Sequence, residues 1–222
     1  MSSELSDQEQ IVLNTVLEYL DKNRQFNMRK IIPFIKSRFK LSSVNISENG
    51  IYEHLRSLVK MKFIIDGSKL SREEILINRK RNRIYSFIQE NPGINFIKIV
   101  EKLDLSHHVV TWHLKMLVLF DYIKKETLEN LSIYFDSNIN FEEAKLNYYA
   151  SKERTKRIIK LLSNNESGTT KTELARTLNM HMNTITKYLN EMEDLKLIYK
   201  KKSLNTTIYL VNEKFLLNQE YS

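Results

Sequence analysis

The sequence contains no cysteine among its 222 residues. Disulfide bonds, thiol redox sensing, thiolate zinc sites and iron–sulfur clusters are therefore excluded. The chain also has only 4 glycines and 2 prolines. This scarcity argues against a glycine-rich phosphate loop and against a large sheet protein with many tight turns.

Long apolar runs are missing as well. No run approaches the roughly 18 residues that a membrane-spanning helix needs, so we expect no membrane insertion. The first ten residues, MSSELSDQEQ, are polar and acidic, and we expect neither a secretory signal nor a transit peptide. The expected location is therefore the cytoplasm.

Motifs for catalysis are a further absence. The chain has no Gly-x-Ser-x-Gly, no cysteine nucleophile and no His-x-x-x-His pair with a glutamate between the histidines. Its carboxylates are scattered, as expected for solvated helix faces. We predict that the protein is not an enzyme and that it uses no cofactor.

The charge balance, in contrast, is strongly basic. The 35 lysine and arginine residues exceed the 27 aspartate and glutamate residues, and the formal net charge is +8. Such a charge attracts polyanions such as nucleic acid. The hydrophobic content of 41% is enough for one to three small apolar cores.

One apolar pattern occurs three times along the chain. Counted from Ser106, it places residues at offsets +4, +7, +8, +11, +16 and +17, and the same offsets hold from Ser47 and from His181. The first four offsets form one stripe on an α-helix, and the last two indicate the start of a strand. In chain order the three sets are Ile51, His54, Leu55, Leu58, Phe63 and Ile64; Val110, His113, Leu114, Leu117, Tyr122 and Ile123; and Ile185, Tyr188, Leu189, Met192, Leu197 and Ile198.

The second and third copies also agree upstream of this helix. Gly93 and Gly168 stand at offset −13, and Asn95 and Thr170 stand at −11 as expected helix N-caps. Each copy therefore predicts a short helix, a tight turn and a second helix. Amphipathic helices are expected before them, over about 79–90 and 151–164, and strand pairs after them, over 122–126 with 131–136 and over 197–201 with 206–211.

The first copy is less regular. A helix is expected over 7–22, and Pro33 either interrupts the next helix or marks its start. The run IIDGSKLS, which begins at Ile64, is too short for a full β-hairpin. We therefore predict a winged helix that has been modified.

Together these patterns predict a mainly α protein with small β-hairpin wings, built from three tandem winged helix-turn-helix units of which the first is modified. The predicted domains are 1–70, 76–136 and 150–213. The first is a candidate interaction unit, and the other two are regular winged helix-turn-helix units.

The second copy resembles the winged helix-turn-helix of archaeal transcriptional regulators that carry several such domains. The resemblance is carried by Asn91-Pro92-Gly93, by the N-cap Ser106 and by the stretch Val110-Thr111-Trp112-His113-Leu114. The third copy is similar with a looser pattern, so the resemblance covers about 76–212. It implies a DNA-binding fold and leaves the target genes open.

The cluster of three histidines and the only tryptophan invites a metal-site interpretation. His113 and His54 share the +7 position of the stripe, which favours packing against the core. Asp104 is the only nearby carboxylate for His107 and His108, so we predict no metal site. Trp112, at +6, either contacts the duplex or packs under the wing.

We expect double-stranded DNA to be contacted by the second and third units. A recognition helix presents its N-terminal turn to base edges, and wings and basic helices contact phosphates. The predicted contacts are His107, His108, Thr111, Asn183, Thr184, Thr186, Lys187, Lys200, Lys201, Lys202, Arg81 and Arg83. Any one basic run is more simply a solvated helix face, but such runs recur beside both of these recognition helices, and this recurrence favours DNA contact.

Glu48 and Glu53 would face phosphates if the first recognition helix bound DNA, so a protein partner is expected for residues 1–70. A homodimer is also a candidate, with 141–150 and 213–221 as dimer helices or as caps of a core. The alternative function is a tandem winged-helix scaffold for protein assembly, as in endosomal sorting or chromosome-associated complexes, without sequence-specific DNA binding.

Overall fold

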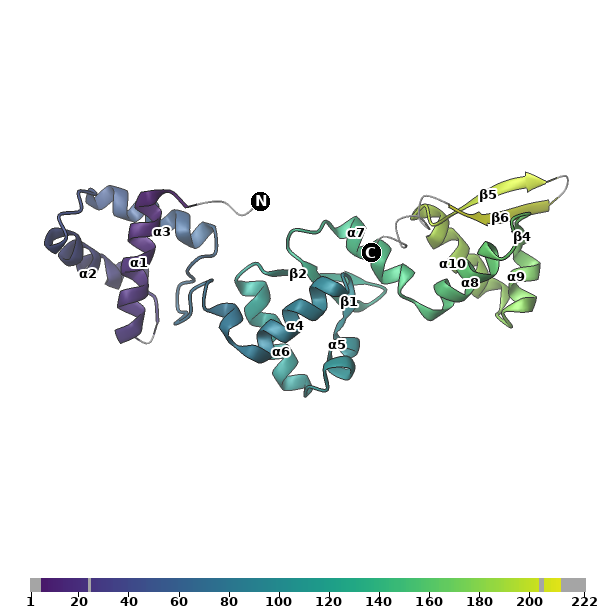
Figure 1. Ribbon diagram of the computed structural model, residues 1–222, viewed down its shortest axis with the longest axis horizontal. Coiled ribbons are helices and arrows are strands. Elements are labelled where there is room, and N and C mark those ends of the chain that lie inside the picture. The colour runs from purple at the N-terminus through teal and green to yellow at the C-terminus, as the bar shows by residue number, and fades with distance from the viewer. Residues whose placement is uncertain (1–4, 24, 204–205, 213–222) are drawn as a thin grey trace. The chain divides into compact units, whose positions relative to one another are not determined.

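The computed structural model describes residues 5–23, 25–203 and 206–212. Residues 213–221, one of the two candidate dimer segments, lie outside the described residues. The chain forms two compact units, an N-terminal unit, Met1–Asn140, and a C-terminal unit, Phe141–Ser222. The N-terminal unit contains the first and second repeats, and the C-terminal unit contains the third (Figure 1).

The first repeat consists of three helices. They are α1 (Asp7–Lys22), α2 (Met28–Leu41) and α3 (Glu48–Lys60). Each begins at a polar N-cap whose side chain accepts a hydrogen bond from a backbone N–H of the first turn: Ser6, Asn27 and Ser47. Pro33 lies inside α2 rather than at its start. One apolar cluster, which includes Leu13, Ile35 and Leu55, joins the three helices.

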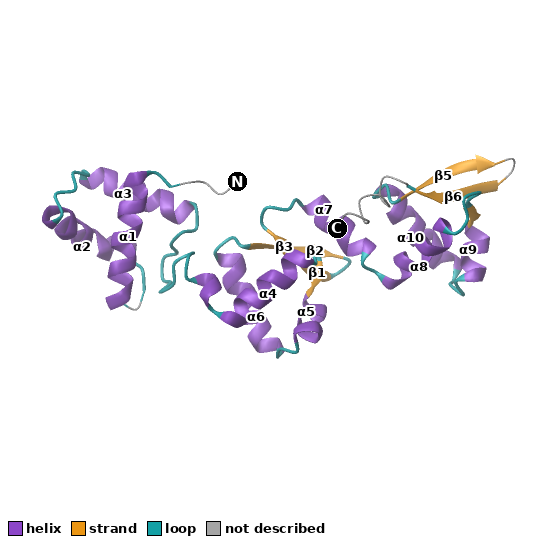
Figure 2. Cartoon of the chain, viewed as in Figure 1, coloured by secondary structure: helices purple, strands orange, loops and turns teal. Residues whose placement is uncertain are grey.

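The first repeat has no β-hairpin among its described residues, as Figure 2 shows. Instead the chain turns at Gly67, whose φ of 80° suits glycine. Phe26 N donates to Ser68 O at 2.7 Å, and Gly67 N donates to Phe26 O at 2.8 Å. This short backbone pairing ends the repeat where the other two repeats extend a wing.

The second repeat has the full winged helix-turn-helix order. After a short 3-10 helix, η1 (Ile75–Ile77), come α4 (Arg79–Glu90), β1 (Ile94–Asn95), α5 (Phe96–Leu103), α6 (His107–Leu119), β2 (Ile123–Leu128) and β3 (Leu131–Asp136). The strands form an antiparallel sheet in the order β1-β3-β2. The wing turns at Glu129 and Asn130, whose φ values of 49° and 64° are typical of a two-residue hairpin loop.

The third repeat follows the same plan within the C-terminal unit. Its elements are α8 (Glu153–Ser163), β4 (Thr169–Thr170), α9 (Lys171–Thr177), α10 (Met182–Asp194), β5 (Ile198–Ser203) and β6 (Thr206–Val211). The sheet order is β4-β6-β5. In Figure 1 the β5–β6 hairpin extends away from the helices. The mainly α fold with small wings, predicted above, is thereby confirmed.

The stripe positions explain why the three helices α3, α6 and α10 fold alike. The residues at +4, +8 and +11 are all buried in each repeat, for example Val110, Leu114 and Leu117 in α6. The predicted N-caps Asn95 and Thr170 accept hydrogen bonds from the backbone of α5 and α9. The two-residue strands β1 and β4 were not predicted, because two residues are too few to show an alternating pattern.

The two matched glycines precede these short strands. Gly93 and Gly168 have φ values of 81° and 82°, which side chains rarely adopt. Gly93 N donates to Tyr134 O at 2.9 Å. A Cβ at Gly168 would stand 3.1 Å from Ile208 Cδ1. Both glycines therefore allow the chain to pass close to the wing.

Helix α7 (Phe141–Ala150) opens the C-terminal unit. Three of its residues, Ala144, Tyr148 and Tyr149, are buried. The ammonium of Lys152 lies 4.6 Å and 4.2 Å from the ring centroids of Tyr148 and Tyr149, and 5.6 Å from that of Tyr188 on α10. Of the two predicted alternatives for 141–150, these contacts favour the cap of a core.

Arg72 connects the first and second repeats. Its backbone N donates to Phe63 O at 2.8 Å, and its carbonyl accepts from the Tyr122 hydroxyl at 2.9 Å. Its guanidinium lies 5.8 Å from the ring centroid of Phe63 and 5.2 Å from that of Tyr122. The connection is therefore packed, which is consistent with one compact unit for both repeats. The domain boundaries 1–70, 76–136 and 150–213 stay a prediction.

Candidate nucleic-acid interface

The N-terminal turns of α6 and α10 carry most of the predicted base contacts. Ser106 caps α6 by accepting from Val109 N at 3.4 Å. The side chains of His107, His108 and Thr111 are exposed. The His107 ring packs edge-on against Phe96 of α5, with centroids 5.4 Å apart. The helix-turn-helix therefore orients one of its two exposed histidines.

Trp112 is 54% exposed. This exposure argues against the alternative in which the indole packs under the wing. Contact with a duplex stays a prediction for this residue. The tip of α6 thus carries an exposed aromatic ring beside Thr111.

His113 occupies the +7 position and is only 7% exposed, as the packing interpretation predicted. Burial lowers the pKa of its imidazole, and the nearby positive charges of Arg81 and Lys80 lower it further. Its Nδ1 has no hydrogen-bond partner among the described residues. At the same offset in the first repeat, His54 is half-buried, and its Nε2 lies 3.0 Å from Gln8 Oε1.

Arg81 does not have the role predicted for it. Its side chain is 4% exposed, and its guanidinium donates to Ile75 O at 2.7 Å. Burial lowers the pKa of this guanidinium, because the charged form loses its water. A buried guanidinium that is bound to a carbonyl of η1 is not exposed for contact with a phosphate. The prediction of Arg81 as a DNA contact is therefore wrong.

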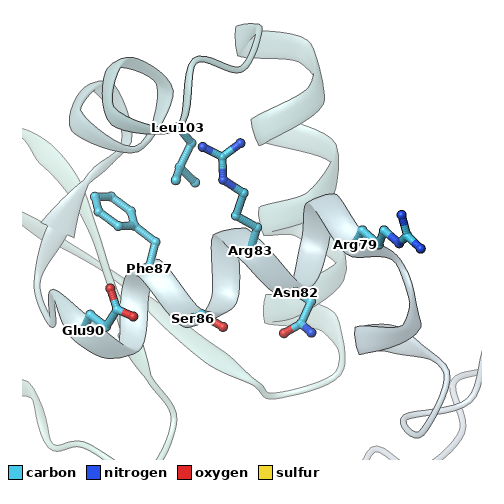
Figure 3. Close-up of a pocket in the computed structure, with 7 residues that line it drawn as sticks. All are labelled: Arg79, Asn82, Arg83, Ser86, Phe87, Glu90 and Leu103. Carbon is cyan, nitrogen blue, oxygen red and sulfur yellow. The ribbon is translucent and has the colours of Figure 1, made fainter.

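Arg83, in contrast, is exposed on α4. It lines an open pocket of about 480 Å³ together with Arg79, Asn82, Ser86, Phe87, Glu90 and Leu103. In Figure 3 the Arg83 side chain extends from α4 toward Leu103, whereas Arg79 points away from it. The basic face of α4 thus consists of Arg79, Lys80 and Arg83, without Arg81.

The tip of α10 is polar. Asn183 and Lys187 are exposed, and Thr184 and Thr186 are half-exposed. The Thr186 hydroxyl donates to Met182 O at 2.9 Å, one turn back in the helix. Lys187 Nζ lies 3.7 Å from Glu191 Oε1, so part of its charge is balanced within the helix.

The wing of the third repeat carries the clearest cationic surface. Lys200, Lys201 and Lys202 are exposed on β5. Lys200 Nζ donates to Glu193 Oε2 of α10 at 2.9 Å, and this hydrogen bond raises the pKa of Lys200. Within the described part of the chain, no ion pair involves Lys201 or Lys202. These two ammonium groups are available to phosphates.

The first repeat differs at the same positions. Glu48 and Glu53 are exposed on the first turns of α3, and Lys36 of α2 pairs with Glu48 at 2.6 Å. Since this repeat also has no wing among its described residues, its recognition-helix position offers little to a polyanion. This comparison agrees with the separate role predicted for residues 1–70.

Sequence reasoning missed two exposed residues of the recognition helices. Lys115 and Asn190 both stand at offset +9, and both are exposed. The signal was present in the repeat itself, because +9 lies on the same helix face as +2, +5 and +6. Neither residue belongs to the apolar stripe that located the helices.

The described residues show neither a metal cluster nor a membrane span. No group of three or more histidine and carboxylate side chains is placed to hold a metal ion there. Nor does any helix in 5–23, 25–203 or 206–212 have the length and apolar character needed to cross a bilayer.

Comparison with known proteins agrees with this geometry. Residues 77–124, from η1 to the start of the wing, match the family described as winged helix-turn-helix DNA-binding. A helix-turn-helix-type transcriptional regulator of Methanocaldococcus jannaschii, itself uncharacterized, is 29% identical over 147 residues. The resemblance to archaeal helix-turn-helix regulators is confirmed. The match covers 66% of this chain and 37% of that relative.

Solved structures show only distant likeness. The DIP2311 protein of Corynebacterium diphtheriae is 9% identical with a TM-score of 0.25, over 81% of this chain and 39% of its own. The endosomal complex ESCRT-II is 13% identical with a TM-score of 0.26, over 94% of this chain and 89% of the compared chain. TM-scores this low do not establish a common fold for the whole chain.

Proposed function

We propose that this protein is a sequence-dependent double-stranded DNA-binding protein and a transcriptional regulator. The observation that carries the proposal comes from the third repeat. There the polar tip of α10 is followed in the chain by a wing with two lysines that take part in no ion pair among the described residues. The match of residues 77–124 to a DNA-binding family supports the same role for the second repeat. The regulatory role is supported by the description of the archaeal relative.

In this proposal the chemistry is non-covalent. Lys201, Lys202 and the basic face of α4 bind phosphates and give affinity without sequence preference. The exposed turns of α6 and α10 bind in the major groove and select sequence through side chains such as Thr111 and Asn183. Arg81 and His113 stabilise the second repeat from inside and do not contact DNA.

A charge-reversal pair tests the wing. In full-length protein, Lys201→Glu with Lys202→Glu removes two cations that have no ion-pair partner among the described residues. We expect weaker binding to a 30-base-pair duplex in fluorescence anisotropy, with a salt dependence less steep by about 0.9 for each phosphate that the variant no longer neutralises. Lys187 is left unchanged in this variant because its charge is already shared with Glu191.

The matched control is Lys40→Glu with Lys60→Glu, which changes the net charge equally. Both lysines are exposed in the first repeat, which we propose lies away from the duplex. An equal loss of affinity in both variants would show that only net charge matters and would refute a role for the wing. Circular dichroism of each variant reports whether it remains folded.

The first repeat, in this proposal, contacts a protein partner instead of DNA. Its exposed carboxylates and the absence of a hairpin among its described residues support that assignment. Asn49 and Asn183 stand at the same offset, +2, in α3 and α10. We expect Asn183→Ala to weaken binding to a preferred duplex and Asn49→Ala to leave it unchanged.

The alternative function is a scaffold that assembles proteins without reading DNA. A scaffold of this kind is expected to show mixed charge and apolar patches over its second and third helices, rather than a continuous basic stripe. The second repeat has one feature of this type, because Trp112, Val118 and Leu119 of α6 are exposed apolar residues. If the folded protein ignores every duplex at low salt, this alternative replaces the DNA-binding proposal.

A further inference from the structure

The composition of the two recognition-helix tips indicates which bases they select. Five offsets, +1, +2, +5, +6 and +9, define the solvent-facing side of each tip. In α6 they are His107, His108, Thr111, Trp112 and Lys115, and in α10 they are Met182, Asn183, Thr186, Lys187 and Asn190. All ten are exposed or half-exposed. None of them is a carboxylate, and neither helix contains arginine.

Threonine occupies offset +5 in both helices. Thr111 is exposed, and Thr186 is half-exposed. The hydroxyl of Thr186 is committed to Met182 O within its own helix, which leaves the methyl group as the part that contacts a ligand. Threonine methyl groups pack against the C5 methyl of thymine in the major groove. The shared +5 position therefore offers thymine contacts from both repeats.

Asn183 adds an adenine-directed group. Its side chain is exposed at offset +2 of α10. Its side chain has no hydrogen-bond partner within the part of the chain that the structure describes, so both the oxygen and the nitrogen of its amide remain available. An asparagine amide donates to N7 and accepts from N6 of adenine, a pairing that guanine does not offer.

Guanine-directed groups are correspondingly weak at these tips. Arginine and lysine are the usual guanine-binding side chains, and arginine is missing from both helices. The ammonium of Lys187 lies within 3.7 Å of Glu191. Lys115 stands at +9, farther from the N-terminal turn that reaches base edges first.

The wing of the third repeat also favours A·T base pairs. Lys201 and Lys202 are exposed cations on a narrow two-stranded element. Cations inserted in the minor groove are attracted most by A·T tracts, because the groove is narrower and more negative there. We infer that the protein selects A·T-rich duplexes through thymine methyl groups and adenine edges. This inference depends on the proposed DNA-binding function.

Three 30-base-pair duplexes of equal length and charge test the inference with the full chain. The first has a mixed A·T core, the second has deoxyuridine in place of every thymine of that core, and the third has a G·C core. Deoxyuridine removes only the C5 methyl group. We expect the A·T duplex to bind on the order of tenfold more tightly than the G·C duplex and several-fold more tightly than the deoxyuridine duplex.

A conservative double variant assigns the effect to the threonines. Thr111→Ser with Thr186→Ser keeps both hydroxyls and removes both methyl groups. It should bind the A·T and deoxyuridine duplexes equally, at the affinity of the unmodified protein for deoxyuridine. The control is Thr15→Ser in α1, where the hydroxyl also donates to a carbonyl one turn back, Ile11 O at 2.9 Å. This control should keep the thymine preference.

The outcomes separate the inference from the function on which it depends. Equal or tighter binding to the G·C duplex, or equal binding to thymine and deoxyuridine, would overturn the inference while DNA binding itself stands. A folded protein that binds none of the three duplexes at about 50 mM salt, a low ionic strength for such assays, would overturn both. A thymine preference that survives in the double serine variant would refute the assignment to Thr111 and Thr186.

Discussion

The second and third repeats share one fold but hold their charges in different places. The second buries Arg81, His113 and Asp136, whereas the only buried polar residues described in the third are the uncharged Thr155 and Thr169. In the wings, by contrast, the third repeat has the larger excess of charge. The second wing balances Lys124 and Lys125 with Glu126 and Glu129, and the third wing has three lysines and no acid in its strands.

The buried carboxylate shows how the second repeat tolerates internal charge. Asp136 accepts hydrogen bonds from the Tyr85 hydroxyl at 2.7 Å, from Gln89 Nε2 at 3.0 Å and from Asn138 N at 2.9 Å. Burial by itself would raise the pKa of Asp136, but these hydrogen bonds outweigh it, and the pKa is lowered. The comparison teaches that the apolar stripe fixes this fold, while the placement of charge is free to differ.

The largest expected effect tests whether the two repeats unfold separately. Leu114 and Leu189 are matched at offset +8 and are both buried. Leu189→Ala should lower the free energy of unfolding of the C-terminal unit by about 2–5 kcal/mol, because it leaves a cavity in the core. Trp112, the only tryptophan, reports on the N-terminal unit alone.

We therefore expect Leu189→Ala to leave the urea midpoint of tryptophan fluorescence unchanged. The part of the circular dichroism transition that comes from the C-terminal unit should move to a lower urea concentration. Leu114→Ala, its counterpart, should lower the fluorescence midpoint. If Leu189→Ala shifts the fluorescence midpoint as well, the two units unfold cooperatively and are not independent folding units.

A smaller effect concerns pH. The pKa of His113 is lowered in the folded state from the ordinary histidine value of 6.5. Below about pH 6.5 the unfolded chain therefore binds a proton at His113 more readily than the folded chain does. The free energy of unfolding of the N-terminal unit should therefore decrease as pH falls below about 6.5. Well above that pH, His113 is neutral in both states and contributes no pH dependence.

Urea unfolding followed by Trp112 fluorescence between about pH 5 and pH 8, which spans the ordinary range of histidine titration, measures this dependence. His113→Gln, which stays neutral throughout, should flatten the profile. A profile that keeps its slope in this variant would assign the dependence to another group.

The smallest expected effect makes the second wing resemble the third. Glu126→Lys places a cation on the exposed face of β2. We expect a modest gain in duplex affinity and a salt dependence steeper by about 0.9, the value for one more neutralised phosphate. An unchanged salt dependence in anisotropy titrations would place the second wing away from the DNA backbone.

Sequence alone determined the triplicated helices. Repeated offsets located α3, α6 and α10, and the N-caps Ser106 and Asn95 marked where helices begin. These features are local, because an apolar stripe and a cap depend on residues within a few turns of one another. The missing wing of the first repeat was also predicted, since a run of a few residues cannot form two paired strands.

Only the tertiary structure decided which charged residues face water. Arg81 and Arg83 belong to one basic run and look alike in sequence, yet Arg81 lies beneath η1 and Arg83 on the surface. Their exposure depends on how η1 and α6 pack against α4. The short strands β1 and β4 likewise exist only through pairing with β3 and β6. Contacts between segments distant in the chain set both features, and no local pattern records them.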